Sequence, residues 1–404
     1  MLDDVCRDLP MDEAPVDSPQ PDERAPSAVA DAPAPPAPVS IPPVVDVYDL
    51  AWDDIAASLQ VNALRARMRQ TVEQLEARLD AEAGLALLFD DCRSGADDRA
   101  LQVAELSDAP LWFIGDIHGD LLAFDAALAL IDREAEREQA HPRIVLLGDL
   151  FDDGGYGLET LLRLYELVLR HSVSVCLLAG NHDEALGYNG ARFTATVAPS
   201  DFCDFLNANL AHEWIGRAGK LAVRLVARAP RALFFPDGLL AVHGGFPLTD
   251  LHDDLARTGN WNHPQCLNDF VWARAHPRAR RKLPNRSTRG SQFGYEDFAA
   301  FCALSATLGR TVTHMVRGHD HVDERYEIYP AYEDHPVLTT VALSRRLVRE
   351  LFGPFVRVPT IARWVRGALP QVYRLHIPES HVRGCYPEAI GEDVVPSPDN
   401  EPRA

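Results

Sequence analysis

Lysine is almost absent from this chain of 404 residues: Lys220 and Lys282 are the only two, so arginine carries nearly all of the positive charge. Acidic residues outnumber basic ones and leave a formal net charge of -21. Proteins that bind nucleic acid need lysine and arginine clustered against the phosphate backbone. We therefore expect no nucleic-acid partner.

The sequence also lacks the patterns of membrane insertion, secretion and disulfide scaffolds. No apolar run reaches the roughly 18 residues of a membrane-spanning helix, and residues 1–4 carry no basic signal segment. The seven cysteines are scattered, odd in number and without a Cys-x-x-Cys spacing. Free thiols in a reducing compartment are the simplest interpretation, so we expect a cytoplasmic protein with no membrane partner.

Both ends of the chain are predicted to be disordered. Residues 1–45 are rich in Pro, Ala and Asp and hold eleven of the thirty prolines. Such a segment cannot bury enough apolar surface to offset its ordering entropy, and we interpret it as a tether rather than a ligand for a proline-binding module. Residues 386–404 form a second, acidic disordered tail.

Residues 46–108 are predicted to be a helical extension. Leu64, Met68, Val72 and Leu75 recur at spacings of three and four and place one apolar stripe on a helix. This stripe could bind a partner helix or pack on the neighbouring domain, and we favour packing.

From residue 109 to 350, short apolar runs alternate with helical patterns, which predicts a catalytic domain of the α/β (α+β) class. Residues 351–385 are predicted to be a C-terminal extension that packs on this core. We interpret its basic stretch 361–366 as partly helical.

Polar side chains stand where several predicted strands of this domain end. A glycine beside each one permits a tight turn and close backbone approach. One such residue is ordinary, since a strand-end aspartate commonly caps the next helix. Because the strands of one sheet place these residues in one crevice, and because their oxygen and nitrogen atoms suit divalent metals, the set predicts a metal site. The polar residues at these strand ends are Asp116, His118, Asp149, Asn181, His182, His243 and His319.

Short motifs carry these residues in a fixed order: Gly115-Asp-Ile-His-Gly119, Gly148-Asp-Leu-Phe-Asp-Asp-Gly154, Gly180-Asn-His-Asp183, His243-Gly-Gly245 and Arg317-Gly-His319. Their order and spacing resemble those of the metallophosphoesterases. Within that superfamily they are similar to the phosphoprotein phosphatases, which include serine/threonine phosphatases and relatives acting on dinucleoside polyphosphates. The resemblance covers roughly residues 109–345 and implies two mixed β-sheets sandwiched between helices, with two metals at the strand ends.

The resemblance also implies two sets of metal ligands. Asp116, His118 and Asp149 would hold one ion, and Asp149, Asn181, His243 and His319 the other, with Asp149 bridging. We expect Mn²⁺, with Fe, Zn or Mg as alternatives. Two such ions activate a bridging hydroxide for in-line attack on phosphorus.

Three further roles follow from the resemblance. His182 matches the general acid that protonates the leaving oxygen. Asp152 matches the carboxylate that orients this imidazole. Arg289 matches an arginine that binds the substrate phosphate.

Two departures from the family pattern concern candidate site residues. Asp153 stands where the family usually has a phosphate-binding arginine, and we consider Arg192, Arg317, Arg345 and Arg346 as substitutes. Gly318-His-Asp-His321 resembles the Gly-His-x-His of the wider superfamily, whose second histidine reaches the first metal. His321 is therefore either a seventh ligand or an ordinary surface residue.

The leading hypothesis is a dinuclear metal-dependent phosphoesterase that hydrolyses phosphate monoesters and resembles a serine/threonine phosphoprotein phosphatase. Its partner would be a phosphorylated protein or a small phosphoester. The alternative within enzymes is a phosphohydrolase for dinucleoside polyphosphates or another small nucleotide. A second alternative is a catalytically weak binding or scaffold protein.

Overall fold

The structure is a computed structural model, and it describes residues 40–59, 61–82, 84–105, 107–280, 290–329, 338–347 and 356–385. The two tails predicted to be disordered lie outside the described residues, apart from residues 40–45, and so does Arg289. From Ile41 onward the chain belongs to one unit, and only this unit is described below.

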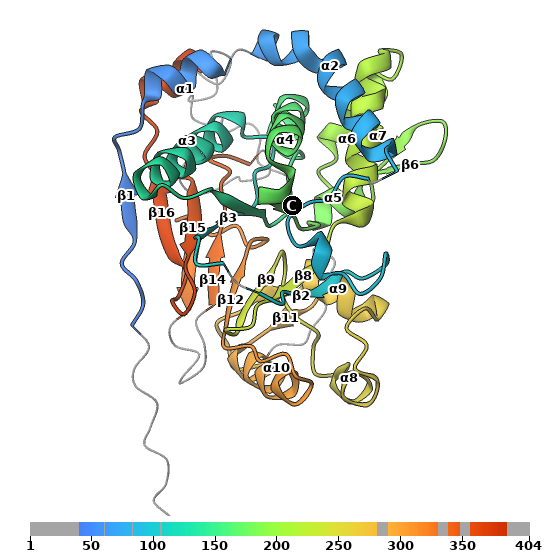
Figure 1. The fold of residues 1–404 in the computed structure, drawn as a ribbon, viewed down its shortest axis with the longest axis vertical. Coiled ribbons are helices and arrows are strands. Elements are labelled where there is room, and N and C mark those ends of the chain that lie inside the picture. The colour runs from blue at the N-terminus through green and yellow to red at the C-terminus, as the bar shows by residue number, and fades with distance from the viewer. Residues whose placement is uncertain are drawn as a thin grey trace, which may run out of the picture. The chain divides into compact units, whose positions relative to one another are not determined.

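The first of the two large sheets has six strands in the order β1-β16-β15-β3-β4-β5 (Figure 1). Its parallel half consists of β3 (Leu111–Ile114), β4 (Arg143–Leu146) and β5 (Val175–Leu177). The other half consists of β15 (Thr360–Trp364), β16 (Gln371–Leu375) and β1 (Val45–Val47). Since β15 runs antiparallel to β3 and β16, this sheet is mixed.

The second large sheet also has six strands, in the order β13-β14-β12-β9-β8-β2. β12 (His314–Arg317) lies parallel to both β9 (Leu239–Val242) and β14 (Leu338–Val341). β13 (Tyr326–Tyr329) and β8 (Ala232–Phe234) add antiparallel pairs, and β2 (Ala100–Gln102) closes the far edge. Two short pairs stand apart: β6 (Gly187–Tyr188) with β7 (Phe193–Thr194), and β10 (Arg274–Ala275) with β11 (Gln292–Phe293).

Helices cover the outer face of each sheet (Figure 1). Over the first sheet lie α3 (Leu121–Glu138) and α4 (Gly157–His171). Outside them, α2 (Val61–Asp80) packs on α4 and α7 (Glu213–Arg228), and α6 (Asp201–Ala208) packs on α7. Over the second lie α8 (His252–Thr258), α9 (Pro264–Trp272) and α10 (Tyr295–Thr307). The predicted fold of two mixed sheets between helices is confirmed. Within the described residues, no helix is both long and apolar enough to span a bilayer.

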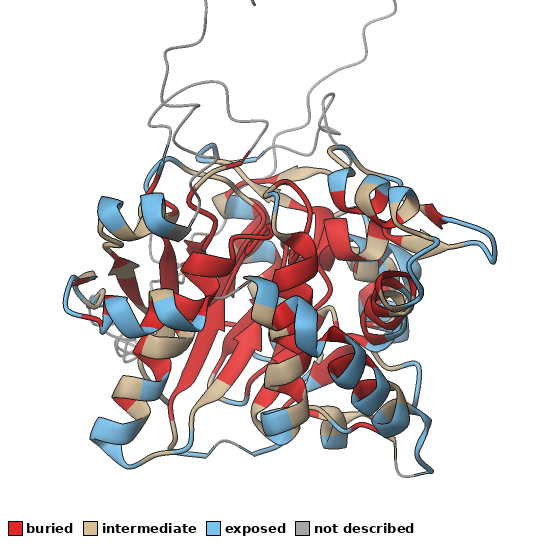
Figure 2. Ribbon diagram, turned by 90° about the horizontal axis from the view of Figure 1, so that it is seen from above, coloured by how far each residue is buried: buried red, intermediate tan, exposed pale blue. Residues whose placement is uncertain are grey.

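The alternation of side chains along each strand explains this layering. In β3, Leu111 and Phe113 share a buried cluster with Ala241 and Val316 of the second sheet. Trp112, between them in sequence, joins the cluster formed with α3 and α4. Successive strand residues point to opposite faces, so a strand covered on both sides reads as a continuous apolar run. Figure 2 accordingly shows the buried residues concentrated in the strands.

The N-terminal extension packs on the domain through the stripe identified in the sequence. Leu64, Met68, Val72 and Leu75 of α2 are all buried in the cluster that α4 and α7 share. The extension is not wholly helical, because β1 and β2 each join one of the large sheets. Before α2 the short helix α1 (Trp52–Ser58) packs beside α3 and α11 (Glu379–Cys385).

The interpretation of residues 361–366 as partly helical was wrong. Thr360–Trp364 form β15, which lies between β3 and β16, so the C-terminal extension supplies two strands of the first sheet. Both faces of β15 are covered, and its sequence therefore lacks the alternation of a half-exposed strand. Its partner β3 lies far away in the chain, and strand formation depends on such partners more than on local propensity.

We predict that Trp364→Ala destabilises the protein by about 3–5 kcal/mol, the usual cost of truncating a buried tryptophan. The indole is 1% exposed, packs 5.4 Å from the ring of Phe235 and donates its N–H to Ala368 O at 2.9 Å. Urea denaturation measures the loss. Arg366→Ala, an exposed position two residues on, is the control and should change stability by less than about 0.5 kcal/mol. Equal denaturation midpoints for both variants and the wild type would contradict the structural role of β15.

Candidate metal centre

The loops that follow β3, β4 and β12 turn sharply at residues that are not glycine. Asp116, His118, Asp149 and His319 have φ of +34°, +48°, +55° and +69°. Non-glycine residues rarely adopt positive φ, and each such conformation costs about 1–3 kcal/mol unless the surroundings hold it. Residues of this kind gather at functional sites. This edge of the two sheets is therefore a candidate functional site.

Two glycines let the loops approach one another closely. A Cβ on Gly318 would lie 2.3 Å from Asp116 Oδ1, and a Cβ on Gly180 would lie 2.2 Å from Asp149 N. Real Cβ atoms do not come this close to other atoms. Gly318 thus lets loops from the two sheets meet, and Gly180 does the same for the loops after the neighbouring strands β4 and β5, because neither position carries a side chain.

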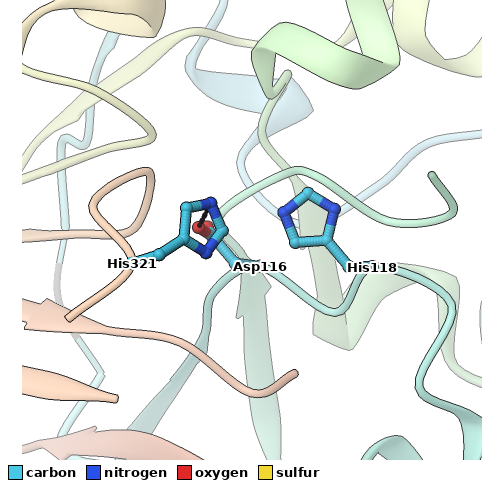
Figure 3. A group of neighbouring side chains, drawn as sticks. All are labelled: Asp116, His118 and His321. Atoms are coloured by element: carbon cyan, nitrogen blue, oxygen red, sulfur yellow. Dashed lines mark ion pairs between the residues drawn. The ribbon is translucent and has the colours of Figure 1, made fainter. Parts of the chain in front are cut away.

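One group of candidate ligands consists of Asp116, His118 and His321, whose ligand atoms all lie within 4.8 Å of one another. His321 Nε2 is 3.6 Å from Asp116 Oδ2, and the rings of His118 and His321 are 5.1 Å apart. Figure 3 shows the three side chains facing a common space, with His321 entering from the loop after β12. The structure thus places His321 beside the predicted ligands of the first ion.

The second group consists of Asp149, His243 and His319, and it is completely buried. His243 Nε2 lies 3.4 Å from Asp149 Oδ2 and 3.1 Å from His319 Nδ1. The amide oxygen of Asn181 is also 3.1 Å from His243 Nε2. All residues predicted for the second ion therefore come together.

A single oxygen of Asp149 lies between the two groups. Asp149 Oδ2 is 3.7 Å from His118 Nε2 in the first group and 3.4 Å from His243 Nε2 in the second. This is the place that a bridging carboxylate oxygen would occupy. The residues expected to hold two metals thus form one continuous site.

Backbone carbonyls orient two of the imidazole rings. His118 Nδ1 lies 2.9 Å from Asp152 O, and His243 Nδ1 lies 2.9 Å from Leu147 O. A carbonyl only accepts, so in the neutral rings Nδ1 carries the proton and Nε2 presents its lone pair to the centre of the site. Metal-binding histidines are commonly held in this way.

The atoms at the centre of the site fit a bound cation. His319 Nε2 is buried and has no hydrogen-bond partner among the described residues. Buried polar atoms of this kind are rare and call for an explanation such as an ion. Carboxylate, imidazole and amide donors suit Mn, Fe or Zn, so the residues present are compatible with the divalent metals implied by the sequence.

Asp183 ends the motif Gly180-Asn-His-Asp183, and the sequence assigned it no role. In the structure it holds the loops after β4 and β5 together. Its carboxylate accepts hydrogen bonds from the backbone N–H groups of Asp149 at 2.7 Å, Leu150 at 2.9 Å and Gly180 at 3.0 Å. Asp320 does the same for the loop after β12, through Arg274 at 3.0 Å and Arg317 at 2.5 Å. Asp183 follows the predicted acid His182 and Asp320 follows the predicted ligand His319, which was the only sequence signal available.

Without a metal, the site concentrates buried charge. Burial alone would lower the pKa of His243, but the carboxylates of Asp149, Asp116 and Asp183 outweigh it and raise that pKa to about 9. Burial and the charge of Asp149 raise the pKa of Asp183 to about 7. In the metal-free protein His243 is therefore protonated at neutral pH, and a cation must displace that proton.

His182 and Asp152 form a buried pair next to these groups. His182 Nδ1 lies 3.2 Å from Asp152 Oδ2, and the His182 ring is 5.3 Å from the ring of His118. Both residues are 2% exposed. Nδ1 of His182 faces the carboxylate, so a proton exchanged with a ligand would leave from Nε2.

Two of the four arginines considered as substitutes for Asp153 are engaged within the protein. Arg317 is fully buried and donates to Gly244 O, Ala273 O and Asp320. Arg345 pairs with Asp120 through Nε and Nη2, both at 2.9 Å. Neither could grip a substrate without breaking these bonds, whereas Arg192 lies exposed on the turn between β6 and β7.

A cavity of about 620 Å³ lies elsewhere, between α1, α3 and α4. Its floor includes Ile144 and Val175, at the amino ends of β4 and β5. The candidate ligands follow the carboxyl ends of the same strands. The cavity is therefore separate from the metal centre.

Two mixed sheets whose strand ends gather buried aspartate and histidine define a candidate centre for divalent metals. The sequence model of the calcineurin-like phosphoesterases matches residues 109–323, more than half of the chain. The chain belongs to this family and is accordingly a phosphoric ester hydrolase. The family implies divalent metal ions as cofactors, which agrees with the donor groups described above.

Curated relatives are named as protein phosphatases. A protein of Schizosaccharomyces pombe, provisionally named a serine/threonine-protein phosphatase, is 27% identical over 265 residues, 64% of this chain and 78% of that protein. The serine/threonine-protein phosphatase 6 catalytic subunit of Drosophila melanogaster is 26% identical over 168 residues, 41% of this chain and half of that protein. Among solved structures, a serine/threonine phosphatase of Saccharomyces cerevisiae aligns over 76% of this chain and 83% of its own, with 16% identity and a TM-score of 0.45.

We predict that the affinity of the second group for Mn²⁺ falls as the pH is lowered from about 9 to 7, by up to about tenfold per unit. The reason is that metal and proton compete for Nε2 of His243, whose pKa is about 9 in the metal-free protein. Competition with a fluorescent chelator across this range measures the affinity. His321→Ala, which alters only the first group, should keep the pH dependence. An affinity that does not vary with pH would contradict the assignment of His243.

Proposed function

We propose that this protein is a dinuclear metal-dependent phosphoesterase that hydrolyses phosphate monoesters, in the manner of a serine/threonine phosphoprotein phosphatase. The observation that carries the proposal is the position of Asp149 Oδ2, within 3.7 Å of His118 Nε2 and 3.4 Å of His243 Nε2. One carboxylate that joins two groups of nitrogen and oxygen donors is the arrangement that a two-metal hydrolase needs.

Each group would hold one divalent ion, and the proposed ion is Mn²⁺. Asp116, His118 and His321, with Asp149, would hold the first; Asp149, Asn181, His243 and His319 would hold the second. When bound, the ions supply Lewis-acid stabilisation of phosphoryl oxygens and lower the pKa of a coordinated water. His321 enters the first set because it lies 3.6 Å from Asp116 Oδ2.

His182 is the proposed general acid. Asp152 Oδ2 faces Nδ1 at 3.2 Å, which fixes the tautomer and stabilises the charged ring. Nε2 then carries the proton that passes to the leaving alkoxide as the P–O bond breaks. General acids of this type contribute about 10²–10⁴-fold to turnover.

The proposed substrate is a phosphorylated protein. The names of the relatives from fission yeast and Drosophila support this choice. Asp153, where a phosphate-binding arginine was expected, is fully buried, so its carboxylate does not add an exposed negative charge to the entrance of the site. Arg289 keeps its proposed role in binding the substrate phosphate, although it lies outside the described residues.

A catalytically weak scaffold is the less favoured proposal. Each metal-ligand candidate and the His182–Asp152 pair lies in a mutually compatible position, and a protein without turnover would have no need of the pair.

The cytoplasmic location remains a prediction, supported by cysteines without disulfide partners in the described residues: Cys92, Cys176, Cys203, Cys266 and Cys302.

We predict that His182→Ala, assayed with Mn²⁺, lowers kcat about tenfold or more on p-nitrophenyl phosphate and about 10²–10³-fold on phenyl phosphate, whose leaving group needs a proton more. Metal analysis should find the wild-type amount of bound metal, because the imidazole is not a proposed ligand. Asp149→Ala is the matched control and should lose both activity and metal. Full activity in the His182 variant would remove this residue from the mechanism.

We further predict that kcat/KM for a phosphoserine peptide exceeds that for diadenosine tetraphosphate by about tenfold or more, since the discrimination reflects differential transition-state binding. Initial rates for both substrates with the full-length, Mn²⁺-loaded protein test this expectation. A preference for the dinucleotide would establish the nucleotide hydrolase instead, and turnover of neither compound would favour the scaffold.

A further inference from the structure

The first turn of α6 lies against the segment that carries Asp152. The backbone N–H of Phe202 donates to Asp152 Oδ1 at 3.1 Å. In the opposite direction, the backbone N–H of Asp153 donates to Asp201 Oδ1 at 2.7 Å. Two hydrogen bonds that run in opposite directions thus join the helix to consecutive residues of this segment.

The carboxylate of Asp152 spans the space between α6 and the proposed general acid. Oδ1 accepts from Phe202, while Oδ2 faces His182 Nδ1 at 3.2 Å. Any rotation of the carboxylate would lengthen at least one of these contacts. The direction in which the His182 ring points is therefore tied to the position of the helix.

The segment from Asp153 to Gly154 has little freedom to adjust without α6. Asp153 has φ of +71°, a conformation that L-residues adopt reluctantly. On the other side, a Cβ on Gly154 would lie only 1.6 Å from His118 O, so the backbone already presses against the loop after β3. The hydrogen bond to Asp201 compensates for the unfavourable conformation of Asp153 by satisfying its backbone N–H.

Apolar packing holds the first turn of α6 in place. Phe202 is 2% exposed, and its ring lies 4.6 Å from the ring of Phe151, the residue before Asp152. A Cβ on Gly157 would lie 2.7 Å from Phe202 Cδ2, so this glycine makes room for the ring. The helix therefore contacts the Asp152 segment through both backbone and side chain.

We propose that Asp201 and Phe202 are positioning residues for the general acid: through Asp153 and Asp152 they set the alignment of His182 with the leaving oxygen. The inference rests on the proposed function, because it requires His182 to donate a proton. Neither residue touches the substrate in this account. Both act through Asp152, and they lie in a part of the chain for which the sequence indicated no functional residue.

If Asp201 acts through the general acid, its replacement should slow some substrates more than others, depending on the leaving group. A misaligned general acid slows esters whose leaving group must be protonated much more than esters with a stable anionic leaving group. A displacement of about 1 Å in a catalytic group can cost up to about 10²-fold. A residue needed only for stability would slow all substrates alike.

The experiment compares Asp201→Ala with the wild type on phenyl phosphate and on p-nitrophenyl phosphate, using full-length protein loaded with Mn²⁺. We expect kcat to fall about 10–30-fold on phenyl phosphate and less than about threefold on p-nitrophenyl phosphate, with KM and bound metal unchanged. Asp201→Asn keeps an oxygen that can accept from Asp153 and should restore kcat to within about threefold of the wild type. Asp204→Ala, an exposed aspartate on the same helix, controls for the loss of one negative charge and should leave both rates unchanged.

A double-mutant cycle separates action through His182 from a general effect on the site. In a His182→Ala background, Asp201→Ala should cause no further loss on phenyl phosphate, because the group that it positions is gone. Additive losses would overturn the proposal. So would a loss that is equal on the two esters, a loss accompanied by reduced metal content, or unchanged rates in Asp201→Ala.

These outcomes differ from those that would overturn the function itself. If the Mn²⁺-loaded wild type hydrolyses neither ester, the proposed function fails and this inference fails with it. If the wild type is active and His182→Ala discriminates between the esters while Asp201→Ala does not, the function stands and only the positioning role is refuted.

Discussion

The carboxylate of Asp149 is the group on which the candidate site depends. One of its oxygens lies between His118 and His243, and the other accepts the backbone N–H of His182 at 2.9 Å. The two groups of candidate ligands and the short helix Asn181–Ala185, which carries the proposed acid, are therefore positioned by the same side chain. The carboxylate of Asp183 accepts the backbone N–H of Asp149 and so fixes the backbone of this loop. A small displacement of the loop after β4 would disturb metal binding and proton transfer together.

This concentration of buried charge has to be supported by the rest of the fold. Without cations, burial raises the pKa of Asp116, while histidines hold the pKa of Asp149 well below its usual range although burial opposes them. Buried ionisable groups are costly unless they are paired or coordinate a metal. The apolar layer between the two sheets supplies the rigid frame that keeps these side chains together, and bound divalent ions would remove most of the electrostatic cost.

Segments outside the residues matched by the family model contribute to this frame. The C-terminal extension places β15 against β3, the strand that leads to Asp116 and His118. In the N-terminal extension, Glu76 of α2 accepts a hydrogen bond through Oε1 from Arg217 Nε of α7 at 3.1 Å. Gly219 of α7 in turn lets Leu206 of α6 approach closely. The N-terminal extension thus supports, through one intermediate helix, the helix that contacts Asp152, which gives the extension a structural role.

The residues that could form the site were predictable from short motifs, because ligand chemistry, strand ends and the glycines beside them are local features of the chain. Asp116, Asp149, Asn181, His243 and His319 could be named from those motifs, and the structure brings them together. The place of His321, the strand character of residues 360–364 and the role of Phe202 could not be decided in this way. Phe202 and Asp152 are 50 residues apart, and β15 pairs with a strand still more distant in the chain. Such features were decided only by the tertiary structure, because the partner of a backbone N–H or of a strand edge is whatever segment packing brings alongside it.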